Sequence, residues 1–152
     1  MFVYKYQNFN LYIYMKNDKI FYIKPFISDE KEHIPKDIKD IFDIYFIEKK
    51  DIENKDIENK DIFYIPDRYK DIYMYLKNHI TFGNVVSYKE LGAKLNLHQR
   101  TIATAMKSNP LPIFIPCHRV VFSGFYKDKN YIGGYNAGVD VKVFLLKHES
   151  VL

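Results

Sequence analysis

The first part of the chain carries short runs of aromatic and β-branched residues, a pattern that is typical of β-strands. The runs cover Phe2–Tyr6, Asn10–Tyr14 and Ile20–Pro25. Asn17 and Asp18 lie between the second and third runs, and both are residue types that turns favour. The pattern therefore predicts a small antiparallel sheet.

A short charged repeat follows the predicted sheet. The pentapeptide Asp-Ile-Glu-Asn-Lys occurs twice between Lys50 and Ile62, and Asp-Ile then begins a third time. Two copies of five residues are too short to build a repeat fold. We interpret the segment as a charged, solvent-facing loop or insertion without a chemical role.

After Asp67 the apolar positions change to the period of a helix. They follow the spacing i, i+3, i+4, i+7 and i+11 along one face, at Tyr69, Ile72, Tyr73, Leu76 and Ile80. Gly83 and Asn84 then interrupt the pattern. The change of period predicts an α/β protein with a strand-rich N-terminal domain, residues 1–65, and a mainly helical domain, residues 66–152.

A capping-box sequence marks the start of the next predicted helix. In Ser87-Tyr88-Lys89-Glu90 the serine oxygen can accept the glutamate amide while the glutamate side chain reaches back. This helix is expected to run from about Tyr88 to Leu95.

A second short helix is predicted after a tight turn. Asn96 is expected to cap it, with Gln99 in the reciprocal position, and Asn109-Pro110 to stop it. Two short helices joined in this way are typical of a helix-turn-helix, although unrelated helical hairpins share the pattern. A last helix is expected over about residues 141–148.

Composition indicates a folded protein with a sizeable core. The 152 residues are 47% apolar and 17% aromatic, which is unlike a disordered chain. The apolar runs are too short for a membrane span, and the N-terminus lacks the layout of a signal peptide. Together with a single cysteine, these features predict a cytoplasmic protein, associated with the nucleoid in a prokaryote.

Charge is distributed unevenly along the chain. Residues 1–79 carry 14 Lys and Arg against 15 Asp and Glu, a net charge of −1, whereas residues 80–152 carry 9 against 4, a net charge of +5. A cationic second half suits a polyanion such as nucleic acid. A merely solvated basic face would explain the same excess.

The single cysteine, Cys117, stands in the run Ile-Pro-Cys-His-Arg-Val-Val. A lone thiol forms no intramolecular disulfide and no multi-cysteine metal site, so it is either a buried small hydrophobe or a reactive nucleophile. The adjacent His118 favours a nucleophile. Two other classes of protein stay open: a helix-turn-helix regulator in which Cys117 is structural, and a cysteine hydrolase that uses Cys117 and His118.

From Asp67 to Glu149 the sequence resembles the O6-alkylguanine-DNA alkyltransferases, the methylated-DNA–protein-cysteine methyltransferases. The resemblance rests on Pro116-Cys117-His118-Arg119-Val120 and on the order and spacing of its flanks. These flanks are Gly83–Tyr88, Gln99-Arg100, Ala105–Pro110, Tyr131–Tyr135, Lys142 and Leu145–Glu149. The resemblance implies a small strand-rich, ribonuclease H-like N-terminal domain before a helical DNA-binding domain.

The resemblance also implies a reaction, direct and irreversible transfer of a methyl or other alkyl group from O6-alkylguanine to Cys117 in a single turnover. O4-alkylthymine is a second candidate substrate. His118 would take the thiol proton through a water, and Glu149 would orient and charge that histidine. Tyr88 would hydrogen-bond the guanine, and Asn109 would hold the turn before the cysteine loop.

DNA contacts follow from the same resemblance, because a base inside a duplex must be flipped out to react. Arg100 matches the arginine finger that fills the gap in the stack, and the small Ala103 would let its helix enter the minor groove. The remaining expected DNA contacts are Gln99, Thr101, Tyr88 and Arg119. The base pocket is expected to consist of Tyr131, Ile132, Gly133 and Met106.

The expected partner is double-stranded DNA that contains O6-alkylguanine, with no membrane and no second subunit, so we expect a monomer. No cofactor is implied, and the lack of cysteine in the N-terminal half predicts no structural zinc there. The bulky, charged segment Phe122–Asn130 leaves the preferred alkyl size open.

Overall fold

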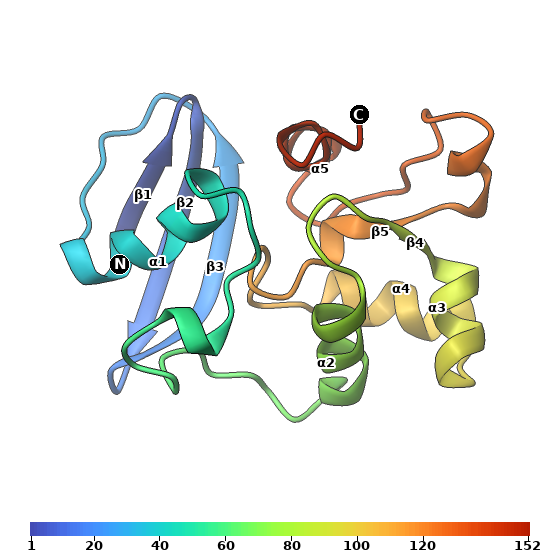
Figure 1. Cartoon of the computed structure of the whole chain (residues 1–152), viewed down its shortest axis with the longest axis horizontal. Helices are drawn as coiled ribbons and strands as arrows, with labels where there is room; N and C mark the ends of the chain where they lie inside the picture. Colours follow the sequence, from blue (N-terminus) through green and yellow to red (C-terminus); the bar gives the residue numbers. More distant parts are fainter.

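A three-stranded sheet lies beside a helical body in the computed structural model, which describes residues 1–152 (Figure 1). Strands β1 (Phe2–Tyr6), β2 (Phe9–Lys16) and β3 (Lys19–Ile27) pair antiparallel in this order. Asn17 and Asp18 form the turn between β2 and β3 with positive φ angles, which Asn and Asp tolerate better than most residues. The predicted sheet is confirmed, with β2 and β3 longer than expected.

Helix α1 (Lys36–Phe46) packs against the sheet and was not predicted (Figure 1). Its buried residues Ile38, Ile41, Phe42 and Tyr45 follow the helical spacing i, i+3, i+4 and i+7. The signal for this helix was therefore present in the sequence, inside a half of the chain that otherwise reads as strands.

The charged repeat is only partly exposed. Ile52, Ile57 and Ile62, the isoleucines of the three Asp-Ile units, are all buried, and a short 3₁₀-helix covers Asn54–Asp56. The prediction of a solvent-facing loop is wrong for these residues, because a five-residue spacing lets each isoleucine anchor the segment in the core while the charged residues between them face water.

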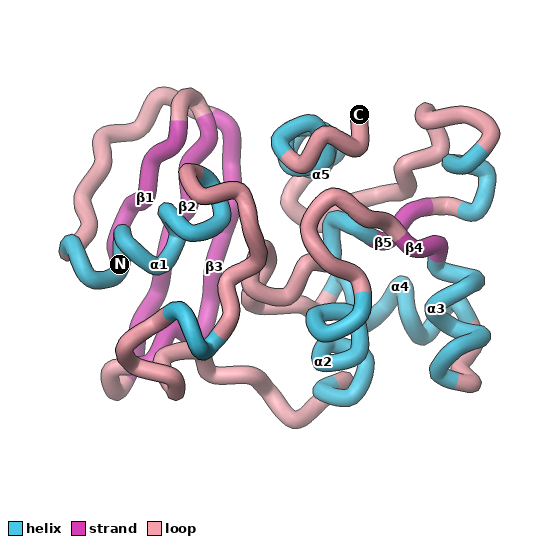
Figure 2. The backbone as a smooth tube through the Cα atoms, in the orientation of Figure 1, coloured by secondary structure: helices cyan, strands magenta, loops and turns pink.

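Four helices form the rest of the body (Figure 2). They are α2 (Lys70–His79), α3 (Tyr88–Leu95), α4 (Gln99–Lys107) and α5 (Val139–His148). The two-residue strands β4 (Val86–Ser87) and β5 (Val120–Val121) pair in parallel. This pairing ties the start of α3 to the chain just after Cys117, so that the predicted helix-turn-helix, α3 and α4, lies beside the cysteine.

The predicted N-cap of α3 is present in the structure, whereas the predicted N-cap of α4 is not. Ser87 Oγ accepts the Glu90 N–H at 3.0 Å, and Glu90 Oε1 accepts the Ser87 N–H at 3.2 Å, so the capping box is confirmed. Asn96 does not cap α4: it ends α3 in the left-handed region, at φ 55° and ψ 45°, whereas an N-cap needs extended backbone. His98 caps α4 instead, because its Nδ1 accepts the Arg100 N–H at 3.0 Å.

One hydrophobic core of 32 buried residues runs from the sheet into the helical body, with members from α1, α2 and α5. A second cluster of four buried residues lies under the segment after β5. The boundary between residues 65 and 66 stays a prediction. None of the helices combines the length and the apolar character that a membrane span requires.

Candidate active site

Cys117 begins a short 3₁₀-helix, Cys117–Arg119, in the loop after α4. The residue is 4% exposed and lines a cavity of about 640 Å³. Asn109 braces this loop: its Nδ2 donates to the carbonyl of Ile115 and its Oδ1 accepts the Leu111 N–H, both at 2.9 Å. Asn109 is thus where its predicted role requires it.

His118 and Glu149 form a fully buried pair behind the cysteine. Nε2 of His118 bonds Oε2 of Glu149, and the Gly83 N–H donates to Oε1 at 2.9 Å. Nδ1 of His118 is buried and has no hydrogen-bond partner within the protein. Because Nε2 is committed to the carboxylate, Nδ1 is the nitrogen that can accept a proton.

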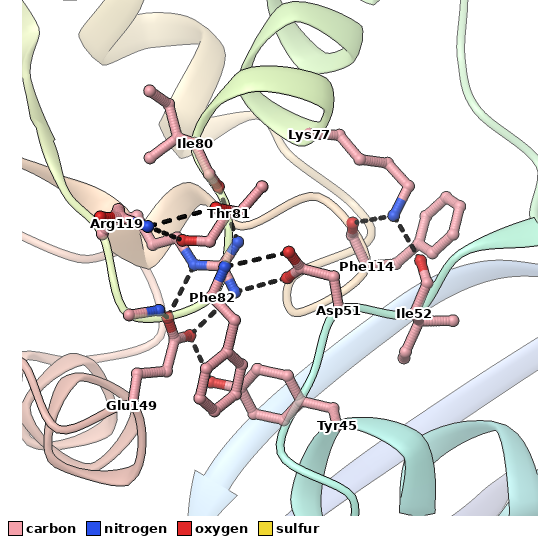
Figure 3. Close-up of polar contacts among 12 residues, drawn as sticks. Tyr45, Asp51, Ile52, Lys77, Ile80, Thr81, Phe82, Phe114, Arg119 and Glu149 are labelled. Atoms are coloured by element: carbon pink, nitrogen blue, oxygen red, sulfur yellow. Dashed lines mark hydrogen bonds and ion pairs between the residues drawn. The ribbon is translucent and has the colours of Figure 1, made fainter.

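Arg119 completes this network (Figure 3), and its side chain does not reach the surface. Its Nε donates to Glu149 Oε1 at 2.8 Å and its Nη2 to Asp51 Oδ1 at 2.6 Å, while Nη1 donates to the Ile80 carbonyl at 2.8 Å. The prediction that Arg119 contacts DNA is wrong, because its side chain is fully buried between two carboxylates that neutralise it.

The charges in this network set the protonation of its members. Burial disfavours an ionised Glu149, but the neighbouring His118 and Arg119 outweigh it and hold the pKa of the carboxyl well below its usual range. Burial lowers the pKa of His118, although Glu149 works in the opposite direction. The histidine is therefore neutral at neutral pH, as a general base must be.

Tyr45 of α1 reaches the same carboxylate from the N-terminal part of the chain. Its hydroxyl donates to Glu149 Oε2 at 2.6 Å and lies 3.5 Å from His118 Nε2. Burial raises the pKa of Tyr45 well above its ordinary value, so it remains a neutral donor. Neither Tyr45 nor Asp51 was predicted as a site residue, because no local motif connects them to Glu149 or Arg119, which lie 104 and 68 residues away.

Tyr135 lines the cavity beside the thiol, and the fully buried Lys142 lies behind the cavity wall. The Tyr135 hydroxyl lies 3.3 Å from Cys117 Sγ, and Lys142 donates to the carbonyl of Val120 at 2.6 Å and of Gly134 at 3.2 Å. Burial raises the pKa of the Cys117 thiol, and the Tyr135 hydrogen bond and the Lys142 charge partly oppose this effect. A base is thus needed to form the thiolate.

Half of the ten residues predicted to contact the DNA or the base line this cavity. They are Gln99, Arg100, Ala103 and Met106 of α4, together with Tyr88. The full lining is Tyr88, Gln99, Arg100, Ala103, Met106, Lys107, Cys117, Phe122, Gly134, Tyr135 and Asn136. Thr101 is half-buried on α4 and lies outside this lining.

The predicted pocket wall is displaced along the chain. Tyr131 is 54% exposed and Ile132 is buried in the smaller cluster, while Gly133 lies behind the ring of Tyr88. The wall consists instead of residues 134–136. The sequences Tyr-Ile-Gly-Gly and Tyr-Asn-Ala-Gly stand four residues apart, so the pattern alone does not indicate that Tyr135, rather than Tyr131, contacts the thiol.

This arrangement can generate a thiolate and present it to a substrate. A buried thiol lies at a cavity of the size that usually holds a small ligand, next to a neutral histidine with one free nitrogen. The cavity opens on the second helix of a helix-turn-helix. Such a site suits attack by the Cys117 thiolate on a group of a molecule that is bound at α4.

Comparisons with known proteins agree with this geometry. Residues 67–151 match the family described as "6-O-methylguanine DNA methyltransferase, DNA binding domain". A methylated-DNA–protein-cysteine methyltransferase of Methanocaldococcus jannaschii is 37% identical over 122 residues, which cover 80% of this chain and 68% of that protein. Relatives of the same name from Methanocaldococcus vulcanius and Thermococcus kodakarensis are matched over 41% and 44% of their lengths.

Solved structures share the fold over nearly the whole chain. The O6-methylguanine-DNA methyltransferase of Pyrococcus kodakaraensis superposes with a TM-score of 0.74 at 22% identity, over 97% of this chain and 96% of that one. A Mycobacterium tuberculosis protein crystallised in complex with DNA superposes with a TM-score of 0.63 at 19% identity, over 93% of this chain and 87% of that one. The predicted α/β fold, with an N-terminal sheet and a helical C-terminal part, is confirmed.

Proposed function

The chain belongs to the methylated-DNA–protein-cysteine methyltransferase family, and we propose that its Cys117 accepts the methyl group of O6-methylguanine in DNA. The observation that carries this proposal is the position of Cys117 at a cavity whose rim is the second helix of the helix-turn-helix. A base that leaves the duplex beside α4 enters this cavity and meets the thiol.

The residues of the buried network prepare the nucleophile. His118 Nδ1 takes the thiol proton through one water, while Glu149 holds Nε2 and stabilises the imidazolium that forms. The thiolate is a soft nucleophile suited to saturated carbon. Its electron pair forms the new carbon–sulfur bond, and the pair of the broken carbon–oxygen bond goes to guanine, which finally takes up the proton.

Tyr88 is the donor that faces the leaving base. Burial raises its pKa to about 12, so the hydroxyl stays protonated at neutral pH and can hydrogen-bond the negative charge that develops on guanine. Arg100, at the start of α4 on the rim of the cavity, fills the place of the flipped nucleotide. We infer that double-stranded DNA is the partner of this site, and we expect the protein to act on it as a monomer without a cofactor.

Incubation with a duplex that carries labelled O6-methylguanine tests this proposal. We expect one label per chain, bound covalently, and no transfer to Cys117→Ser, which should still bind the duplex. Cys117 is the only cysteine, so labelling of the serine variant would contradict the assignment.

The same experiment separates the two other classes of protein. A regulator with a structural cysteine would bind the duplex and take up no label. A cysteine hydrolase would leave the duplex unchanged and turn over a small ester or amide many times, whereas a thioether gives the proposed acceptor no route back to the thiol.

A further inference from the structure

One face of the β2–β3 hairpin carries aromatic and basic side chains. Tyr14 of β2 pairs with Tyr22 of β3, and residues directly opposite each other in this way share a face of the sheet. Lys16 and Lys19 form the next pair on this face, beside the turn, and Lys24 follows Tyr22 by two residues. The alternate positions of both strands supply residues of the core. We call these five residues the open hairpin face.

The open hairpin face is in contact with solvent. Tyr22 is 41% exposed, Tyr14 is half-buried, and the three lysines are exposed. The rings of Tyr14 and Tyr22 have their centroids 5.6 Å apart and are tilted by 58°, so they form one aromatic platform. Two neighbouring tyrosines on an exposed face are typical of a surface that binds a partner.

The charge of this face indicates the kind of partner. None of its three lysines makes an ion pair with the protein. Strands β2 and β3 contain no aspartate or glutamate, and the only acidic residue of the hairpin is Asp18 in the turn. Three uncompensated ammonium groups attract a polyanion.

Aromatic rings beside unpaired lysines match the chemistry of a single-stranded nucleic acid. A single strand offers base faces that stack on exposed aromatic side chains and phosphates that pair with lysine. In a duplex the bases stack on one another, so a duplex would use the lysines and leave the tyrosine pair without a partner. The open hairpin face therefore favours unpaired nucleotides.

The open hairpin face continues toward helix α4. In Figure 1, β3 is the strand of the sheet nearest to the helical body, and the N–H of Ile23 donates to the carbonyl of Pro110, just after α4, at 2.8 Å. Tyr22 and Lys24 line a hollow between β3 and the end of α4, which Lys107 lines as well. A nucleic acid bound at α4 can thus extend onto the hairpin, which favours DNA over RNA.

We propose that the open hairpin face binds single-stranded DNA that extends from a duplex bound at α4. A base stacks on the platform of Tyr14 and Tyr22, and phosphates pair with the three lysines. The inference requires neither a damaged base nor a reaction of Cys117, and it rests on the proposed function only for the duplex at α4.

The test compares two unmodified DNA probes that differ only in a single-stranded extension. One is a blunt duplex, and the other is the same duplex with about ten unpaired nucleotides at either its 5′ or its 3′ end. The Kd of the full-length protein for each probe is measured by fluorescence anisotropy. We expect at least one extension to lower the Kd of the wild type about tenfold, and Tyr22→Ala to abolish this gain, because stacking of one base has this effect.

Matched variants separate stacking from charge. Tyr22→Phe keeps the ring and should keep the gain, and Tyr22→Ala should leave the Kd for the blunt duplex unchanged. The triple variant Lys16→Met, Lys19→Met, Lys24→Met should reduce the slope of log Kd against log salt for the extended probe by about 2, since each phosphate contact of a single strand contributes about 0.7. Lys60→Met, at an exposed lysine of the charged repeat, should not change this slope.

Three outcomes would overturn the inference: no gain from either extension in the wild type, an undiminished gain in Tyr22→Ala, or an equal loss of affinity for both probes in that variant. Any of these together with normal methyl transfer would leave the proposed function standing. A wild-type protein that shows the gain through Tyr22 but transfers no methyl group would overturn the proposed function alone.

Discussion

Tyr45 donates a hydrogen bond to Glu149 across 104 residues of sequence, with 2.6 Å between the two oxygens. The contact joins helix α1 to the carboxylate that holds His118. The N-terminal part of the chain is therefore more than a support for the DNA-binding part, because it supplies a direct contact to the residues that we propose activate the thiol.

Tyr45→Phe removes this donor and leaves the ring in place. With one hydrogen bond fewer, Glu149 becomes a stronger acceptor for His118, so the imidazole holds its proton to a higher pH and is less available as a base. We expect the acidic limb of the pH–rate profile of methyl transfer to move to higher pH. Tyr64→Phe, at an exposed tyrosine without such a bond, should not move it. If Tyr45→Phe lowers the transfer rate equally at every pH and leaves the acidic limb in place, the contact is purely structural.

Asp51→Asn tests the part of the network that the charged repeat supplies. Asp51 accepts from Arg119 Nη2 at 2.6 Å and from the Phe82 N–H at 3.0 Å. Breaking one side of a mostly buried ion pair should lower the free energy of unfolding by about 2 kcal/mol, as measured by urea denaturation. Asp61→Asn changes the exposed aspartate of the third Asp-Ile unit and should cost almost nothing. Equal losses would show that Arg119 does not depend on Asp51.

Tyr135→Phe and Tyr131→Phe form a matched pair that tests which tyrosine serves the thiol. The Tyr135 hydroxyl lowers the pKa of the Cys117 thiol, so its removal should slow alkylation at neutral pH about tenfold, the value of one hydrogen bond to a charged group. The rate should recover at higher pH, where the thiolate forms without help. Alkylation by iodoacetamide reports this directly, because the chain has a single cysteine. Tyr131→Phe should leave the profile unchanged; a larger effect there would reverse the assignment.

Arg100→Ala separates extrusion of the base from the chemical step. Arg100 lies on the rim of the cavity, while Cys117 and its network lie below. We expect the variant to slow transfer from O6-methylguanine in a duplex more than reaction with free O6-benzylguanine, because only the duplex requires base flipping. Lys89→Ala, at an exposed lysine of α3, serves as the control for loss of charge. Equal slowing on both substrates would remove the finger role.

Local sequence signals predicted the local structure of this chain well. Ser87 and Glu90 satisfy each other within one turn of helix, so their capping box could be identified without knowing the fold. The role of Asn96 could not be identified in this way, because an asparagine suits an N-cap and a left-handed C-cap equally. Only the packing of the turn decides that His98 takes the cap.

Contacts between distant segments explain what the sequence pattern missed. Arg119 sits in the cysteine motif and carries a charge, so a DNA contact was a reasonable expectation. Its actual partners are Asp51, 68 residues before it, and Glu149, 30 residues after it, and no spacing rule connects the three. The buried network is therefore a property of the tertiary structure, whereas the reactive thiol and its histidine are adjacent in sequence.

The stability of the folded chain should increase with pH through the titration of Lys142. Burial lowers the pKa of Lys142 from 10.5 to about 8, so between these values the unfolded chain binds more protons than the folded one. Stability then rises with pH, by up to about 1.4 kcal/mol per pH unit. We expect the difference in unfolding free energy between wild type and Lys142→Met to grow in favour of wild type from about pH 8 to about pH 10. Lys147→Met, at an exposed position of the same helix, should give no such slope, and a flat difference for Lys142→Met would mean that the amine stays charged in the folded protein.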